Sequence, residues 1–279
     1  MNSCLPVFFL YLLICAWHPV VQAQFSPDSL EALSKVVALP HAHSHNDYEQ
    51  QHPLSDALFL GFTSIEVDIW VHHSELLVGH TKGQAKSRNQ NIEDLYFKPL
   101  AKIFEELGNH PFHEYQGPIL LFVDIKNEPA LAFMMIEKLA KEYAWMFQTP
   151  EFPDRPAKLI LTGKREIVPI LEESDRISTI DGTMEDLSKR ISTDAMPTIG
   201  VSYKEVMFWN GKGQIPPNDQ QVLESIVRQV HRQDKQLRIW GAPDRPEVWR
   251  AFLVAGVDLI NTDHLEDFKE VAELWMTID

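Results

Sequence analysis

The chain has 279 residues, 44% of them hydrophobic, and a formal net charge of −15 at pH 7. That length is ample for a large core, and a single α/β barrel can use all of it. The acidic balance argues against a general nucleic-acid binder, whose affinity rests on cationic contacts to phosphate, and it leaves no basic face for an anionic membrane.

Residues 1–23 are predicted to be a secretory signal peptide, followed by a single domain over residues 24–279. The apolar run 5–16 is too short for a transmembrane helix, and the stretch VQA at 21–23 supplies small residues before a cleavage point. Both cysteines lie in this segment, so the mature chain would have no disulfide. We therefore expect a secreted or periplasmic protein. Because no Lys or Arg precedes the apolar run, a membrane anchor formed by an uncleaved signal is the alternative.

Short apolar, β-branched runs alternate with helical patterns along the rest of the chain. The predicted strands are 36–43, 63–70, 118–126, 157–163, 176–182, 197–202, 236–241 and 257–263. The predicted helices are 56–61, 98–108, 130–146, 220–235, 245–256 and 266–276. This alternation indicates right-handed βαβ units and a parallel sheet, and eight strands is the number in a TIM (β/α)8 barrel. A doubly wound open sheet is the alternative, but its nucleotide-binding form has a glycine-rich turn after the first strand, where this chain has HAHSHNDY.

Polar residues concentrate where the predicted strands end. In a barrel of this kind the active site lies at the C-terminal ends of the strands. In chain order these residues are His41, His43, His45, Glu66, Asp68, His80 (which closes the segment ELLVGH), Asp124, Lys126, Thr162, Asp181, Ser202, Trp240, Asn261 and Asp263.

The stretch SIEVDIW places two carboxylates in a strand that otherwise looks buried. Glu66 and Asp68 are two residues apart, so their side chains share one face of the strand. Two carboxylates side by side repel each other unless a cation lies between them, and Asp124 on the neighbouring strand would be a third oxygen donor. All-oxygen ligation favours a hard ion, so one Mg²⁺ or Ca²⁺ is expected. The alternative is that the pair lies on a solvated face.

Other polar residues at these strand ends each have an ordinary structural interpretation. Isolated histidines are more often structural than catalytic, although three of the same parity end the first strand. Lys126 lies two residues after Asp124, so its side chain is on the same face of the strand and points into the same barrel mouth. A salt bridge to Asp124 would be its simplest role. A lone tryptophan such as Trp240 is more often part of the core.

Several longer stretches resemble one known family. SHNDY, PLSDALFLGFTSIEVDIW and ELLVGH are similar to the altered inheritance of mitochondria protein 6 family, within the phosphatidylinositol phospholipase C-like and glycerophosphodiester phosphodiesterase superfamily. The similarity continues in DLYFKPL, LLFVDIKNE, RIWGAPDRPEVW and GVDLINTDHL, and it spans nearly the whole mature chain. The resemblance implies a TIM barrel of the PLC-like phosphodiesterase type and a metal-dependent phosphoric diester hydrolase.

The resemblance also implies roles for individual residues. His45 and His80 match the catalytic histidines, and Lys126 the accompanying lysine. Glu66, Asp68 and Asp124 match the metal ligands, and Asn46 and Trp240 take substrate-binding positions. One departure concerns the substrate, because glycerophosphodiesterases typically begin with His-Arg-Gly where this chain has His-Asn-Asp at 45–47.

The implied chemistry suits these residue types. Cleavage of a phosphodiester builds negative charge that a divalent ion and Lys126 would stabilise. One histidine would activate the nucleophile and the other protonate the leaving oxygen. The nucleophile is left open between water, a substrate hydroxyl and a histidine. His41 and His43 are expected to be mainly structural.

Two alternative functions remain at this stage. An amidohydrolase-like metal hydrolase also has His-x-His after its first strand, but it would want histidines where this chain has Asp181 and Ser202. The other is a non-catalytic barrel that binds a lipid or glycan. For the phosphodiesterase we expect a small phosphodiester or phospholipid-derived substrate, no nucleic acid, no stable transmembrane anchor, and a monomer.

Overall fold

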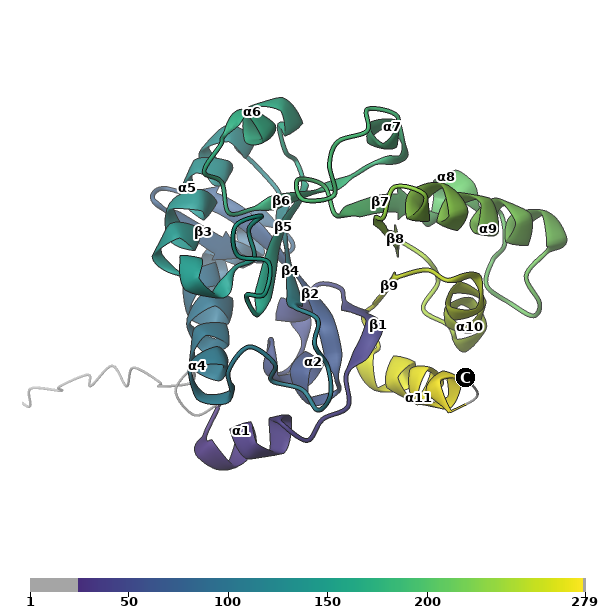
Figure 1. The fold of residues 1–279 in the computed structure, drawn as a ribbon, viewed down its shortest axis with the longest axis horizontal. Coiled ribbons are helices and arrows are strands. Elements are labelled where there is room, and N and C mark those ends of the chain that lie inside the picture. Colours follow the sequence, from purple (N-terminus) through teal and green to yellow (C-terminus); the bar gives the residue numbers. More distant parts are fainter. Residues whose placement is uncertain (1–24, 278–279) are drawn as a thin grey trace, which may run out of the picture.

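The computed structural model describes residues 25–277 and shows a closed barrel of eight parallel strands surrounded by helices (Figure 1). The barrel strands are β1 (Leu39–Ser44), β2 (Phe62–His72), β4 (Ile119–Ile125), β5 (Ala157–Gly163), β6 (Thr179–Gly182), β7 (Thr198–Ser202), β8 (Gln236–Trp240) and β9 (Leu259–Thr262). Each strand pairs with the next along the chain, and β9 closes the ring by pairing with β1. The predicted TIM barrel is thereby confirmed. The predicted signal peptide, residues 1–23, lies outside the described residues.

Apart from α1, which precedes β1, the helices follow strands, as βαβ units require. They are α1 (Pro27–Leu33), α2 (Ser55–Phe59), α3 (Lys82–Arg88), α4 (Lys98–Leu107), α5 (Pro129–Glu142), α6 (Ile167–Glu172), α7 (Met184–Leu187), α8 (Tyr203–Val206), α9 (Pro217–His231), α10 (Pro246–Ala255) and α11 (Leu265–Met276), with the short turns η1 (Asp47–Glu49), η2 (Glu93–Phe97) and η3 (Ala144–Met146). Local sequence sets several ends: α5, α9 and α10 begin at a proline, which suits the first turn, and Gly256 ends α10 with φ of 83°.

Alternation along the strands separates two buried regions. In β2 the side chains of Ile65, Val67 and Ile69 face the helices and are fully buried in the main core. The other parity faces the barrel lumen. There a second apolar cluster, formed by Leu120, Phe122, Ile160 and Leu259, fills the lumen below the polar residues. We call this cluster the lumen plug. Asp124 follows Phe122 by two residues, so it lies on the same face of β4, one step nearer the mouth.

One strand was not predicted. β3 (Glu75–Val78) folds back antiparallel on the long end of β2, with Ile69 opposite Val78. It has only four residues, too few for an alternation pattern to stand out. The hairpin returns the chain to the barrel mouth, and this return brings His80 close to Asp68.

Candidate active site

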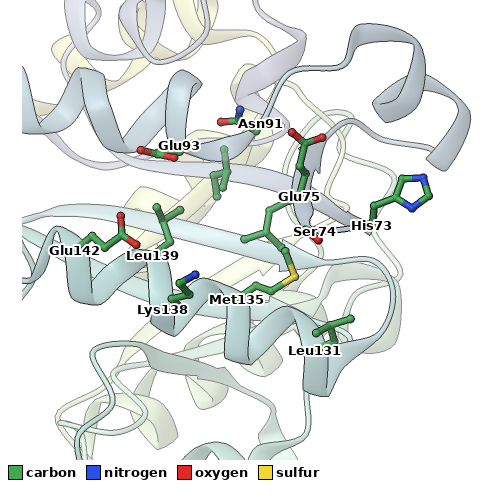
Figure 2. A pocket seen from close by; sticks show the side chains of 12 residues that line it. His73, Ser74, Glu75, Asn91, Glu93, Leu131, Met135, Lys138, Leu139 and Glu142 are labelled. Carbon is green, nitrogen blue, oxygen red and sulfur yellow. The ribbon is translucent and has the colours of Figure 1, made fainter.

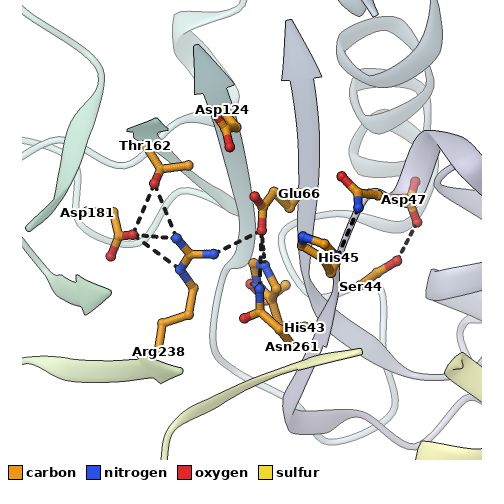
Figure 3. A network of polar contacts seen from close by, with 12 residues as sticks. His43, Ser44, His45, Asp47, Glu66, Asp124, Thr162, Asp181, Arg238 and Asn261 are labelled. Carbon is orange, nitrogen blue, oxygen red and sulfur yellow. Dashed lines mark hydrogen bonds and ion pairs between the residues drawn. The ribbon is translucent and has the colours of Figure 1, made fainter. Parts of the chain in front are cut away.

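Three carboxylates meet at the mouth of the barrel, and Figure 3 shows two of them, Glu66 and Asp124. Glu66 and Asp68 come from β2, and Asp124 comes from β4, where it is in register with Asp68. Each offers an oxygen within 4.8 Å of the others. Glu66 and Asp68 are buried, because the parity that carries them faces the lumen and not solvent. The pair in SIEVDIW is therefore a lumen pair, and the solvated-face alternative is wrong.

Lys126 bridges two of these carboxylates. Its Nζ lies 2.8 Å from Asp124 Oδ2 and 2.9 Å from Asp68 Oδ2. Burial alone would lower the pKa of Lys126, but the two carboxylates outweigh it and raise that pKa. Burial and the neighbouring Asp124 raise the pKa of Asp68 to about 6, against the pull of Lys126. The lysine thus forms the predicted salt bridge and also faces the cavity described below.

Arg238 is a site residue that sequence reasoning missed. From β8 it donates to Glu66 Oε2 at 2.9 Å and to Asp181 Oδ2 at 2.7 Å, and its other contacts reach Thr162 (Figure 3). Burial would lower the pKa of Arg238, but the carboxylates Asp181 and Glu66 raise it above its usual value. Burial also works against ionised Glu66, yet Arg238 holds the pKa of that carboxyl well below its usual range. The available signal was parity, because Arg238 precedes Trp240 by two residues on the same strand.

The histidines of the first strand lie at successive depths in the barrel. His41 Nδ1 is 3.0 Å from the carbonyl of Val257, just before β9 begins. His43 is fully buried, with Nδ1 2.7 Å from Ser64 Oγ and Nε2 2.8 Å from Glu66. Burial lowers the pKa of His43 to about 4, so it is neutral near pH 7. A mainly structural role stays the prediction for both residues.

His45 is held by a carboxylate at the mouth. Its Nδ1 lies 2.8 Å from Asp263 Oδ1. A carboxylate only accepts hydrogen bonds, so Nδ1 carries a proton and Nε2 is left for another partner. Burial would lower the pKa of His45, but the bond to Asp263 and the charge of Glu66 raise it. Asn46, with φ of 48°, sits beside it, with its amide 3.0 Å from His45 Nδ1.

His80 contacts the cluster through Asp68. Its Nδ1 is 3.3 Å from Asp68 Oδ2, and its side chain is 61% exposed. Tyr48 donates to the same oxygen at 2.8 Å. The β2–β3 hairpin explains how a residue so far along the chain returns to the cluster. The two predicted catalytic histidines therefore both lie near the carboxylates, His45 just after β1 and His80 just after β3.

A cavity of about 570 Å³ opens over the cluster. Its polar lining includes His45, Glu66, Asp124, Lys126, Arg165 and Arg238, and its apolar lining includes Met184, Val206 and Trp240. Of the predicted site residues in the described part of the chain, Asp68, His80 and Asn46 do not line it. A second cavity of about 450 Å³ lies outside the barrel, between the β2–β3 turn and α5 (Figure 2), and contains none of the predicted site residues.

The donor set fits a divalent ion held by oxygen. Asp68 Oδ1 is buried and has no partner among the described residues, as expected for an atom that awaits a ligand. Lys126 is shared by Asp68 and Asp124, and Arg238 is shared by Glu66 and Asp181, so each of these cations pairs with two carboxylates. Two carboxylates that share one cation still repel each other, and a divalent cation held between them would reduce that repulsion.

The fold and its site define a class of protein. The barrel is similar to a glycerophosphodiester phosphodiesterase from Parabacteroides distasonis, with a TM-score of 0.54, 14% identity, and coverage of 86% of this chain and 100% of that chain. It is likewise similar to a glycerophosphodiester phosphodiesterase from Agrobacterium tumefaciens, with a TM-score of 0.51, 13% identity, and coverage of 85% and 100%. At such low identity this likeness shows a shared TIM-barrel fold.

Sequence comparison then gives the family. The AIM6-like phosphodiesterase domain model matches residues 31–177, more than half of the chain, so the chain belongs to that family. The glycerophosphoryl diester phosphodiesterase family model matches residues 236–266. Altered inheritance of mitochondria protein 6 from Eremothecium gossypii is 27% identical over 269 residues, which cover 83% of this chain and 69% of that protein. The homolog from Arthroderma benhamiae is 27% identical over 268 residues, which cover 84% of each chain. The predicted family is confirmed.

Proposed function

We propose that the chain is a metal-dependent phosphoric diester hydrolase that acts on a phospholipid head group or a glycerophosphodiester-like substrate. One observation carries the proposal: His45, oriented by Asp263, faces the same cavity as Lys126 and the carboxylates Glu66 and Asp124. Membership of a phosphodiesterase domain family supports it.

The proposed chemistry assigns each polar group a task. Mg²⁺ or Ca²⁺ bound by Glu66, Asp68 and Asp124 would supply positive charge to the phosphoryl oxygens. Lys126 stabilises the charge that develops in the transition state, because it faces the cavity as a cation.

The two histidines move protons in this proposal. With Nδ1 bonded to Asp263, His45 uses Nε2 to exchange a proton with the substrate. His80 is the second acid–base group, because it reaches the cluster beside Asp68 from the turn after β3.

The cavity lining supports an amphipathic substrate. The lining combines the cations Lys126, Arg165 and Arg238 with the apolar side chains of Met184, Val206 and Trp240. Asn46 stands where glycerophosphodiesterases typically have an arginine, but Arg238 on β8 and Arg165 after β5 line the same cavity. A phosphodiester with an organic group on one side suits such a wall.

Turnover of a small aryl phosphodiester tests the proposal. We expect hydrolysis that a chelator abolishes and Mg²⁺ or Ca²⁺ restores, with metal affinity lost in an Asp68→Asn, Asp124→Asn double variant. Asp175→Asn is the matched control, because Asp175 pairs with Lys141 on the surface. Turnover that is insensitive to the chelator would contradict the metal assignment. Binding of metal and of a phosphodiester without any turnover would favour the non-catalytic barrel, and hydrolysis of amides alone would favour the amidohydrolase-like alternative.

A further inference from the structure

The loop after α8 holds one aromatic side chain almost wholly in solvent. Phe208 is 97% exposed, whereas its neighbours Met207 and Trp209 are buried. Single exposed apolar residues are common on proteins. This one lies between two fixed residues, because the amide of Met207 donates to the carbonyl of Tyr203 at 2.9 Å and Trp209 is held by further hydrogen bonds.

Three hydrogen bonds fix that backbone. The hydroxyl of Tyr203 donates to the carbonyl of Trp209 at 2.6 Å. The amide of Trp209 donates to Asp219 Oδ2 at 2.6 Å, and its indole donates to the carbonyl of Lys212 at 3.0 Å. Phe208 is therefore presented outward by a loop that is anchored immediately after it.

The loop lies at the mouth of the barrel, beside the candidate cavity. Val206, two residues before Phe208, lines that cavity, as does Trp240, which is 43% exposed. Ser202 and Trp240 are in register at the ends of β7 and β8. Further along the loop, Gly211 lies so close to Pro243 that a side chain at position 211 would contact it. The loop that carries Phe208 thus packs against the segment that follows Trp240.

We propose that this rim docks on a zwitterionic phospholipid surface, with Phe208 and Trp240 inserted between the head groups. Aromatic side chains favour that interface, because their rings are apolar and tolerate a partly hydrated setting. Docking there would turn the cavity toward the lipid head groups. The inference deepens the proposed function and rests on it for the identity of the substrate.

The charge distribution favours a neutral surface over an anionic one. The chain carries a net charge of −15, which an anionic bilayer would repel. Beside Phe208 the exposed side chains of Lys204 and Lys212 roughly offset that of Glu205, so the rim has no strong basic patch. Insertion of apolar rings, and not attraction between charges, would supply the binding free energy.

Partition of the protein onto phosphatidylcholine vesicles tests the proposed docking surface. Full-length wild-type and variant chains are compared, so that residues 1–23 contribute equally to each. Phe208→Ser should weaken partition by about tenfold or more, as expected for one lost Phe insertion. Phe152→Ser is the matched control, because Phe152 is 45% exposed in the loop that enters β5, at the opposite end of the barrel. It should leave partition unchanged, and raised salt should weaken wild-type partition little.

Turnover of the soluble aryl phosphodiester separates this inference from the proposed function. Phe208→Ser should keep wild-type turnover of that substrate. If the wild-type chain hydrolyses this substrate but does not bind vesicles, the proposed docking surface alone is wrong. If it binds vesicles but does not hydrolyse the substrate, the proposed hydrolase activity alone is wrong. The surface is also overturned if both Phe variants lose partition equally, or if binding needs anionic lipid and disappears at high salt.

Discussion

At the scale of single residues, Arg238 has the strongest expected effect on stability. Its buried guanidinium pairs with Glu66 and Asp181, so Arg238→Met would leave two buried carboxylates without their cation. Breaking a buried pair in this way costs about 3–5 kcal/mol of unfolding free energy. The control is Arg228→Met, since Arg228 pairs with Glu224 on the surface and such pairs contribute at most about 1 kcal/mol. Denaturant unfolding measures both, and equal losses would disprove a special role for the lumen arginine.

The two proposed acid–base residues should affect rate and not folding. His45→Ala and His80→Ala are each expected to lower kcat by about a hundredfold or more at saturating metal, with metal still bound. His231→Ala is the control, because His231 Nε2 lies 2.8 Å from Asp258 in a similar pair away from the cavity. His43→Ala should act mainly on metal affinity, through Glu66. Near-normal turnover in His80→Ala, together with loss in His43→Ala, would contradict the assignment.

Residue parity predicted part of this site and could not predict the rest. It placed Glu66, Asp68 and Asp124 on lumen-facing positions, because strand alternation is a local property. The partnerships of Arg238 with Asp181 and of His45 with Asp263 join residues that lie far apart in the sequence. Such pairings depend on barrel closure and register, which no local pattern records.

At the scale of elements, the β2–β3 hairpin controls the place of His80. Gly79 lies beside α3, and an added Cβ would come within 2.7 Å of the amide nitrogen of Ala85. Gly79→Ala should therefore shift the turn and lower turnover. Gly83→Ala in α3 is the control, because its Cβ would meet only Thr81 Oγ1 at 4.0 Å. Steady-state kinetics on both variants decides it, and equal turnover would show that His80 needs no such support.

The loop that carries His45 is anchored through a second buried carboxyl. Asp47 accepts hydrogen bonds from the amide of Leu54 at 2.6 Å and from Tyr96 and Ser44 at 2.9 Å. Burial nevertheless raises the pKa of Asp47 from 3.8 to about 6. The folded state then binds a proton that the unfolded state has lost, so this carboxyl stabilises the protein most below about pH 4, and the benefit fades as the pH rises through about 6.

Asp47→Asn should remove that dependence. The difference in unfolding free energy between wild type and variant is expected to change by roughly 3 kcal/mol between about pH 4 and pH 7. Denaturant unfolding across this range measures it. A difference that stays constant with pH would show that Asp47 titrates normally.

Element prediction succeeded where patterns were long. The strand predicted at 157–163 agrees with β5 at both ends, and all six predicted helices are present. The missed helices α1, α3, α6, α7 and α8 have four to seven residues each, too short for a helical period to repeat. β1 begins at Leu39, three residues later than predicted, because the chain before it pairs only at Val37, in an isolated bridge to His113.

At the scale of the whole molecule, the first described residue bears on the proposed export signal. Phe25 is 2% exposed and stacks against Phe59, so cleavage after Ala23 would leave the core intact. We propose that residues 1–23 are removed and that the mature protein works outside the cytoplasm. N-terminal sequencing of protein from the native host should begin at Gln24, and a chain that retains Met1 in the cytosol would contradict the proposal. Among residues 25–277, no helix is both long and apolar enough to cross a bilayer.

The lumen plug restricts how substrate enters and product leaves the proposed site. Leu120, Phe122, Ile160 and Leu259 fill the barrel beneath the carboxylates, so apolar side chains close the base of the cavity and the lumen offers no passage through the barrel. Whatever is cut inside must leave by the route along which it entered, and the water that follows must use the same opening. A product that lingers there would block the next substrate outright, and it should therefore act as a competitive inhibitor.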